Sequence, residues 1–252
     1  MRSFTNWSSI FVCIFGLLLM GISSGCENEK ENIDPSTYGY EYFPLKVGQY
    51  WIYQSDSIVL FSAGTIRDTS ASLIREDVVD FFINENMDSI FIVNVSGKSL
   101  PDGEWTFQKK IFLSKDSHKA LRQEGNLVFT KMVFPIRPSV RFDHNQYFDP
   151  TINIEIGGEV FNAMYDGWNT RIDNSSTPVL WLGQPVENVR IRYVDDNSTS
   201  LEKKLYYETY IKGVGLYKKQ MIFLQDNKGG AQPIEERAIK GFYHDLILVE
   251  HN

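Results

Sequence analysis

The sequence predicts a mainly β protein, built as a single antiparallel curved sheet or a partly open β-barrel. From Tyr42 onward, apolar and polar residues alternate mostly with a period of two, as they do in half-buried strands. Aromatic residues make up 14% of the chain, and such residues favour strands and large buried surfaces. Turn signals separate the alternating runs at short intervals, so consecutive strands are expected to pair antiparallel.

The first half of the predicted sheet contains four clear strands and one segment that could be a strand or a helix. Residues 101–103 (Pro-Asp-Gly) and 124–126 (Glu-Gly-Asn) carry turn chemistry, and the second of these segments predicts a hairpin. Residues 71–84 fit either an amphipathic helix or a twisted strand, and their β-branched and aromatic content favours the strand. The four strands are predicted at residues 49–61, 89–96, 105–113 and 127–134.

The second half of the chain is also predicted to consist of strands joined by short turns. Residues 195–200 (Asp-Asp-Asn-Ser-Thr-Ser) and 226–230 (Asp-Asn-Lys-Gly-Gly) are predicted turns. No internal repeat and no clean boundary interrupts the series, so a single antiparallel β domain is expected over residues 41–252. The strands of this half are predicted at residues 189–194, 204–211, 215–224 and 241–249.

The first 25 residues have the order of a secretory signal peptide. Arg2 supplies the basic start, residues 10–22 form an apolar run, and the small residues 23–25 precede Cys26. The run is shorter than the roughly 18 apolar residues that a spanning helix needs. A cysteine at this position resembles the lipobox of bacterial lipoproteins, which implies a lipoprotein signal peptide over residues 1–25 and lipidation of Cys26. The alternative is an ordinary signal peptide that ends near a cysteine.

The segment after Cys26 is expected to be a flexible tether, residues 26–40, because it is polar and lacks periodicity. Its acidic residues Glu27, Glu29 and Glu31 resemble the export signal that directs Bacteroidota lipoproteins to the outer cell surface. A plain linker also needs polar residues, so both interpretations of the acidic cluster stay open.

Charge and cysteine content exclude several classes of protein. Loss of residues 1–25 removes Arg2 and changes the formal net charge from −7 to −8. An acidic chain without a block of basic residues does not favour nucleic acid or anionic lipid head groups as partners. Since Cys13 lies in the predicted signal peptide, the mature domain has neither a disulfide nor a cysteine nucleophile. The lysine pairs at 109–110, 203–204 and 218–219 are expected to lie on solvated strand faces.

Several segments, taken together, resemble an uncharacterised Bacteroidota lipoprotein family. Residues 42–53 (Tyr-Phe-Pro-Leu-Lys-Val-Gly-Gln-Tyr-Trp-Ile-Tyr) resemble the opening of that family, in which Pro44 and Gly48 set a turn before the first long strand. Residues 213–219 (Gly-Val-Gly-Leu-Tyr-Lys-Lys) resemble its glycine-x-glycine-leucine segment. The remaining matches are residues 131–136, 141–147 and 239–243, of which 141–147 carry Phe142 and His144 where relatives commonly have tryptophan and glycine.

The resemblance implies an antiparallel β domain on a lipid anchor, with no activity assigned to the group. Residues 56–58 and 88–90, both Asp-Ser-Ile, also resemble the O-glycosylation sequon of exported Bacteroidota proteins.

No catalytic, metal or cofactor site is predicted. Residues 213–215 lie between two strands, whereas a dinucleotide site needs a strand followed by a helix, so a tight hairpin or a bulge is expected there. The chain has no Gly-x-Ser-x-Gly elbow, and carboxylate pairs are too common in a β domain to indicate a glycosidase. The histidines do not have the spacing of a chelate; they are His118, His144, His244 and His251.

Aromatic side chains in loops are the candidate ligand-binding residues. Trp51 and Trp105 lie within alternating strands and are expected in the core. Trp168 follows an Asp-Gly pair and Trp181 lies close to Gly183, so these two are expected to be more exposed. The predicted binding face consists of Trp168, Trp181, Tyr147 and Tyr165.

These observations favour a lipid-anchored lipoprotein of the cell envelope, at the outer membrane and facing the periplasm or the surface, that acts as a binding or scaffolding module. Its expected partners are the membrane, through the N-terminal lipid, and an outer-membrane protein or a glycan or lipid ligand. The alternative is a carrier that shelters a lipid or another apolar ligand on a concave sheet. A glycan- or peptide-processing enzyme is the third hypothesis, and the sequence favours a protein that is not an enzyme.

Overall fold

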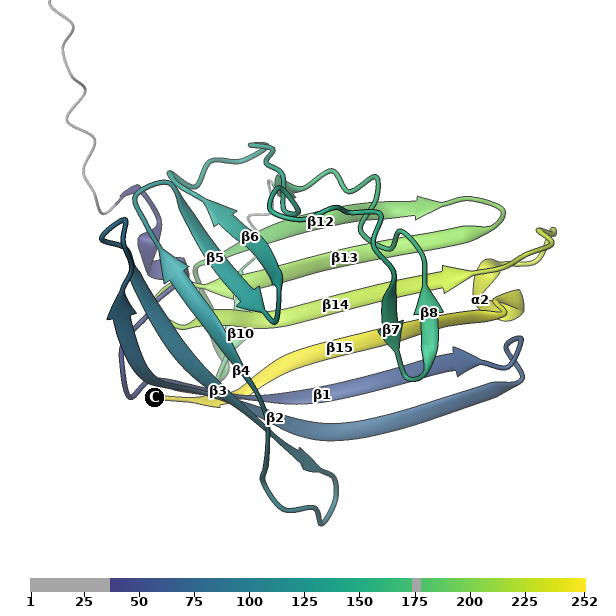
Figure 1. Cartoon of the computed structure of the whole chain (residues 1–252), viewed down its shortest axis with the longest axis horizontal. Helices are drawn as coiled ribbons and strands as arrows, with labels where there is room; N and C mark the ends of the chain where they lie inside the picture. The colour runs from purple at the N-terminus through teal and green to yellow at the C-terminus, as the bar shows by residue number, and fades with distance from the viewer. Residues whose placement is uncertain (1–36, 174–177) are drawn as a thin grey trace, which may run out of the picture. The chain divides into compact units, whose positions relative to one another are not determined.

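The computed structural model describes residues 37–173 and 178–252. The predicted signal peptide, Cys26 and residues 26–36 of the predicted tether lie outside the described residues. The described residues are mainly β, and their strands form one large, curved antiparallel sheet (Figure 1). The fold class predicted from the sequence is therefore confirmed.

The sheet has 11 strands and runs as two meanders that meet in its middle. Each meander pairs strands that follow one another along the chain, so most connections are hairpins. In spatial order the strands are β6 (Leu127–Val133), β5 (Lys119–Glu124), β4 (Thr106–Lys115), β3 (Ser89–Ser99), β2 (Ile66–Ile83), β1 (Tyr50–Phe61), β15 (Lys240–His251), β14 (Gly215–Gln225), β13 (Glu202–Ile211), β12 (Asn188–Ser198) and β9 (Arg171–Ile172).

The first and last long strands of the described chain, β1 and β15, join the two meanders. They pair antiparallel along most of their length, from Trp51 opposite His251 to Leu60 opposite Gly241. The sheet therefore depends at its centre on a contact between residues nearly 200 positions apart.

Two short hairpins and two short helices complete the described residues. The hairpins are β7 (Ile154–Ile156) with β8 (Glu159–Phe161) and β10 (Val179–Trp181) with β11 (Gln184–Val186). The helices are η2 (Tyr40–Tyr42) and α2 (Ile234–Arg237). Over residues 37–173 and 178–252, the structure contains no helix with the length and apolar character needed to cross a bilayer.

The segment around His144 lies between the two edge strands and links them. The backbone N–H of Thr130 in β6 donates to the carbonyl of His144, at 2.9 Å. Two residues earlier, the N–H of Phe142 donates to the carbonyl of Thr170, which directly precedes β9, at 3.1 Å. This segment gives backbone partners to both edges of the nearly closed sheet, where unpaired N–H and C=O groups are otherwise exposed.

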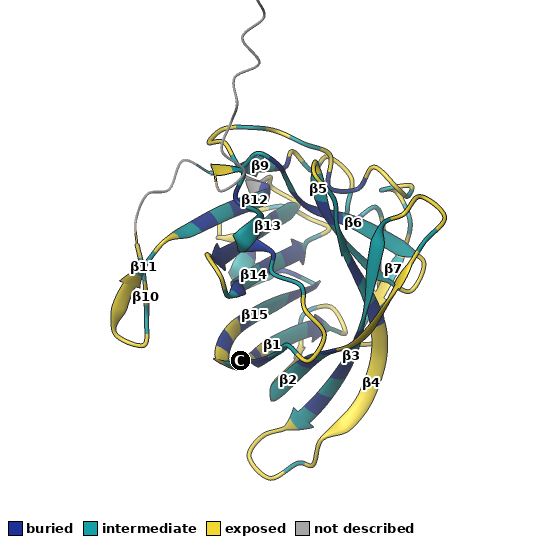
Figure 2. Cartoon of the chain, turned by 90° about the vertical axis from the view of Figure 1, so that its left-hand side faces the viewer, coloured by how far each residue is buried: buried dark blue, intermediate teal, exposed yellow. Residues whose placement is uncertain are grey.

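The main core fills the inner side of the curved sheet. Alternation in β3 shows the principle: Val93 and Val95 are buried, whereas the residues between them are partly exposed (Figure 2). From the hairpin β7–β8, Phe161 packs edge-on against Phe223 and Phe242, with ring centroids 5.4 and 5.5 Å apart. Edge-to-face contacts of this kind add to the hydrophobic gain of burial.

A second, smaller core lies on the outer face of the sheet, under helix α2. It consists of Leu60, Leu224, Ile234 and Ala238, all nearly inaccessible to solvent. The sequence predicted only a turn after residue 225, because a helix of four residues is too short to show periodicity.

The predicted strands are confirmed, with several differences at their ends. Residues 71–84 form a strand, and β2 begins earlier than expected, at Ile66. β12 continues to Ser198, so the predicted turn at 195–200 is wrong over most of its length and the hairpin connection is the short segment 199–201. The expected hairpin at residues 213–215 is present, with Ile211 opposite Gly215. Strands β5 and β7 to β11 were not predicted.

Trp105 does not lie in the core as the sequence suggested. It directly precedes β4 and is 41% exposed, while Trp51 is 4% exposed. The β4 end of the sheet carries other exposed aromatic residues, including Phe107. No second layer covers this part of β4, so alternation there does not imply burial.

Candidate functional site: a cavity on the inner face of the sheet

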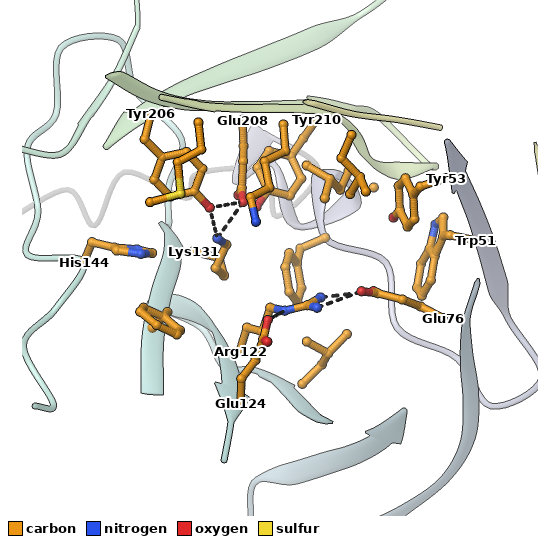
Figure 3. A pocket seen from close by; sticks show the side chains of 18 of the residues that line it. Trp51, Tyr53, Glu76, Arg122, Glu124, Lys131, His144, Tyr206, Glu208 and Tyr210 are labelled. Carbon is orange, nitrogen blue, oxygen red and sulfur yellow. Dashed lines mark hydrogen bonds and ion pairs between the residues drawn. The ribbon is translucent and has the colours of Figure 1, made fainter. Parts of the chain in front are cut away.

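A cavity of about 190 Å³ lies on the inner face of the sheet (Figure 3). Its wall is drawn from strands on both sides of the β1–β15 pair and from the segment after η2. Six charged side chains line it together with aromatic and aliphatic residues. The charged ones are Glu76, Arg122, Glu124, Lys131, Glu208 and Lys219.

The carboxylate of Glu208 lies at one end of the cavity and is 2% exposed. Its Oε1 atom accepts hydrogen bonds from the ammonium of Lys131, at 2.8 Å, and from the hydroxyl of Tyr206. Its Oε2 atom accepts from the hydroxyl of Tyr210 and lies 2.7 Å from that of Tyr193. Both oxygens of Glu208 therefore accept hydrogen bonds, and the Tyr193 hydroxyl shares its proton between Oε2 and the carbonyl of Lys131; such pairing allows a carboxylate to be buried.

The alternation of β13 explains why Glu208 is buried. Tyr206, Glu208 and Tyr210 are two residues apart, so all three side chains point to the same face of the strand. That face is the inner one, where the two tyrosine rings bury large apolar surfaces beside the carboxylate.

The protonation states in this cluster follow from burial and pairing. Burial raises the pKa of Glu208, but Lys131, Lys219 and the hydrogen-bond donors outweigh burial and hold the pKa at about 2. Burial and the charge of Glu208 raise the pKa of Tyr206 and Tyr210 well above 10, so these hydroxyls remain protonated donors. Burial lowers the pKa of Lys131 to about 8, although Glu208 opposes this shift.

A second ion cluster lies on the opposite wall, on strands β2 and β5 (Figure 3). Arg122 binds Glu76 through two parallel hydrogen bonds, of 2.7 and 3.0 Å, and its Nε atom donates to Glu124 at 2.6 Å. Lys109 donates to the other oxygen of Glu124. The bidentate geometry holds the guanidinium plane in one orientation beside the cavity.

The apolar part of the wall comes from the segment after η2 and from strands β1, β4, β6, β14 and β15. Trp51 is anchored by a 2.6 Å hydrogen bond from its Nε1 atom to the carbonyl of Val214. Gly215, with φ of +103°, lets the backbone of β14 approach the Trp51 ring and Pro44, because a Cβ there would lie 3.4 and 3.5 Å from them. The other apolar lining residues are Phe43, Leu45, Tyr53, Leu113, Phe129, Leu216, Met221 and Leu246.

Four of the segments that carry the family resemblance meet at this cavity, and residues 141–147 contribute His144. Residues 42–53 contribute Pro44 and Trp51, residues 131–136 contribute Lys131, and residues 213–219 contribute Gly215 and Lys219. The N–H of Gly213 also donates to the carbonyl of Glu41, at 2.9 Å, which joins residues 213–219 to the residue directly before the segment 42–53. Residues far apart in the sequence are thereby brought to one place.

Both inner-face histidines are neutral. Burial lowers the pKa of His144 well below 6.5, and its Nδ1 atom lies 2.7 Å from the carbonyl of Thr130. Burial lowers the pKa of His244 to about 3, and its Nε2 atom lies 3.1 Å from Oγ of Ser55. Within residues 37–173 and 178–252, no three His, Cys, Asp or Glu side chains are grouped so that they could hold a metal ion.

The structure separates the four aromatic residues that the sequence proposed as one binding face. Tyr165 lines the cavity. Trp168 contacts the ring of Tyr165, with centroids 5.1 Å apart, and lies behind the cavity wall against Tyr206. Tyr147 is 44% exposed and lies under the ammonium of Lys119. Trp181 lies on β10 and packs against Tyr217 and His251.

The charged residues of the cavity were not identified from the sequence. The expectation that lysine pairs lie on solvated faces is wrong for Lys219, which lines the cavity, and for Lys204, which is 8% exposed. Because successive residues of a strand point to opposite faces, one lysine of each such pair faces inward. The signal available in the sequence was Glu208 in phase with Tyr206 and Tyr210, since a carboxylate in an aromatic strand face predicts a buried, paired charge.

The two predicted glycosylation sequons lie on strands of the sheet. Ser57 is in the middle of β1, where its Oγ atom is 2.8 Å from that of Ser70. Ser89 is the first residue of β3 and is partly exposed.

Comparisons with known proteins give distant similarities. No protein-family model matches the chain, and no curated protein matches it. A solved structure of a predicted lipoprotein from Parabacteroides distasonis is similar at 10% identity and a TM-score of 0.41, covering 84% of this chain and 98% of the other. A predicted exported protein with a YmcC-like fold from Bacteroides fragilis is similar at 9% identity and a TM-score of 0.40, covering 83% and 98%.

Proposed function

We propose that this protein is a lipid-anchored binding module of the cell envelope and that its curved sheet encloses a small ligand in the inner cavity. The observation that carries the proposal is the cavity of about 190 Å³, with charged side chains in its wall. Protein interiors leave few voids larger than a water molecule, and a concave site with a few convergent polar groups is typical of ligand binding.

The protonation states favour binding over catalysis. A general acid or base works best with a pKa near the ambient pH, but the pKa of Glu208 is about 2 and that of Glu124 is lowered too, by Arg122 and Lys109 against the effect of burial. Lys131, with a pKa of about 8, is already bonded to Glu208. Glu208, Glu124 and Lys131 therefore keep their charges in neutral solution, so the cavity presents the same charges to a ligand at all times.

The cavity volume favours a small ligand over a membrane lipid. Pockets that enclose drug-sized ligands have volumes of about 300–1,000 Å³, and this cavity is below that range. A lipid carrier with the same sheet needs a larger apolar space, so the carrier hypothesis requires the sheet to open further.

The anchor and its location are part of the proposal and rest on the sequence. In this proposal, lipidation of Cys26 attaches the module to the outer membrane. A partner in the outer membrane fits the scaffolding alternative, in which the cavity has a structural role only.

One purification tests both parts. The full-length protein is extracted from its native envelope in mild detergent, its intact mass is measured, and the small molecules released on denaturation are identified by mass spectrometry. We expect a mass increase from acyl chains and one small organic molecule in near-stoichiometric amount. An unacylated chain contradicts the anchor, and a stoichiometric outer-membrane protein without a small molecule favours the scaffolding alternative.

A pair of neighbouring variants links the ligand to the cavity. Leu246→Trp places a large ring in the cavity, because Leu246 is buried in its wall. The control Ile247→Trp changes the next residue of β15, which is 39% exposed and faces outward. We expect the first variant to lose the ligand and the second to retain it, with urea unfolding used to confirm that both are folded. Equal retention of the ligand by both variants contradicts the proposed site.

A further inference from the structure

One lysine of the cavity is not part of an ion pair or a side-chain hydrogen bond among the described residues. Lys219 lies on β14, directly opposite Glu208 of β13 and Leu246 of β15, and it lines the cavity. Within residues 37–173 and 178–252, its ammonium forms no hydrogen bond and no ion pair, and the carboxylates of Glu208 and Glu124 act on it only through their charge. Its ammonium faces the ring of Tyr206 instead, 5.7 Å from the centroid.

The carboxylates around the cavity are already engaged. Both oxygens of Glu208 accept hydrogen bonds from Lys131 and from tyrosine hydroxyls. Arg122 binds Glu76 and Glu124, and Lys109 binds the second oxygen of Glu124. Three carboxylates are thus matched by three cations, which leaves Lys219 as one positive charge in excess.

The neighbouring strand β15 presents an apolar residue and a neutral imidazole to Lys219. Leu246 is its partner in the ladder, and the nearby His244 is a neutral imidazole bonded to Ser55. Burial lowers the pKa of Lys219, and the opposing charges of Glu208 and Glu124 do not outweigh burial, because no acceptor in the described part of the chain is bonded to the ammonium. A buried ammonium in this state is stabilised by any anion that reaches it.

The rest of the cavity selects for the size and polarity of that anion. The walls beside Lys219 are apolar, formed by residues such as Leu216, Met221 and Leu246. An engineered cavity of about 150 Å³ binds benzene, so this one, at about 190 Å³, has room for a ring or short chain with one polar group. A dianion such as phosphate is disfavoured, because the ammonium of Lys219 balances only one of its two charges.

We propose that the ligand of this cavity is a small amphipathic monocarboxylate, whose carboxylate pairs with Lys219 and whose apolar body packs against the walls around Met221 and Leu246. This inference rests on the proposed function, since it names the chemical class of the ligand in the same cavity. Lys219 then acts as the specificity residue: it distinguishes the acid from neutral molecules of the same shape.

The test compares matched probes on matched variants of the full-length protein in mild detergent. Benzoate is the acid probe and benzamide its neutral counterpart of similar shape, with affinities measured by titration calorimetry. The variants are Lys219→Met, Lys219→Gln and, as the control, Lys218→Met, which changes the neighbouring residue on the outer face opposite Thr209 and Ile247. The probe comparison in the unmodified protein needs no variant, so it stays informative if Lys219→Met is unfolded.

We expect the unmodified protein to bind benzoate at least tenfold more tightly than benzamide, as one charge-assisted hydrogen bond provides. Lys219→Met and Lys219→Gln should remove that preference, and Lys218→Met should keep it. Equal binding of both probes, or an unchanged preference in the Lys219 variants, overturns the monocarboxylate but leaves the cavity as a binding site. If neither probe binds and no small molecule co-purifies from the envelope, the proposed function fails as well.

Discussion

The buried pair of Glu208 and Lys131 allows a quantitative test of how the inner face is stabilised. Glu208 is 2% and Lys131 5% exposed, and their charged atoms are 2.8 Å apart. Glu208→Gln keeps the shape and most hydrogen-bonding positions of the side chain but removes the negative charge. In this variant, the buried ammonium of Lys131 has lost its anionic partner.

We expect Glu208→Gln to lower the free energy of unfolding by about 3–5 kcal/mol, the usual cost of leaving one member of a buried ion pair behind. For a domain of this size, that corresponds to a fall in Tm of about 6–20 °C. The reverse change, Lys131→Met, should cost less, because three tyrosine hydroxyls still surround the Glu208 carboxylate.

The assay is urea unfolding of the two single variants and the double variant, followed by tryptophan fluorescence and far-UV circular dichroism. The double variant contains neither buried charge, so it should be more stable than Glu208→Gln alone. The stability lost by the double variant should then be smaller than the sum of the two single losses, and the difference, which is the coupling energy between the two sites, should be several kcal/mol. A double variant that loses the full sum of both single losses, or a Glu208→Gln loss below about 1 kcal/mol, would refute the reasoning.

Three further predictions follow from single groups. The pKa of Glu208 in the folded protein is about 2, below its ordinary 4.5, so the stability that its charge contributes is complete above pH 4.5 and is lost as the pH falls towards 2. Between pH 4.5 and 2, the urea midpoint of Glu208→Gln should therefore fall less steeply than that of the unmodified protein. The pKa of His244 is about 3, below its ordinary 6.5, so the folded protein should lose stability as the pH falls from 6.5 towards 3. His244→Gln should remove that part of the pH dependence, and an identical pH profile in the variant would contradict a buried neutral imidazole. Gly125 has a φ of +59° and no atom near a new Cβ, so Gly125→Ala should lower the free energy of unfolding by about 1–2 kcal/mol in thermal unfolding. Gly64→Ala should lower it more, because its Cβ would lie 2.3 Å from the carbonyl oxygen of Ala238. Equal losses would show that this contact relaxes freely.

The sequence allowed the long strands to be predicted because each is half-buried and therefore alternates. Alternation in β3, with Val93 and Val95 inside, is visible in the sequence and in the structure. The strands that were missed are short: β9 has two residues and β7, β8, β10 and β11 have three each, too few to show a period. Their positions depend on what they cover, such as Phe161 on Phe223, and not on local propensity.

The candidate site was less predictable, because it depends on contacts between distant strands. The lysines at 218–219 look equivalent in the sequence, and only the position of β14 between β13 and β15 determines that Lys219 faces the cavity. Of the proposed aromatic residues, only Tyr165 lines it. The polar network around Glu208 joins β6, β12 and β13, which no short-range pattern relates to one another.

The pairing of β1 with β15 has a consequence for the order in which the chain can acquire its structure. Synthesis produces β1 early and β15 among the last residues, yet each supplies half of the ladder at the middle of the sheet. Until residues 240–251 emerge, β1 and β14 are open edges, and the two meanders have no bond to one another through the sheet. Closure of so distant a pair is slow, because the intervening chain must first lose its freedom. The two meanders can therefore be joined through the sheet only after β15 has been synthesised.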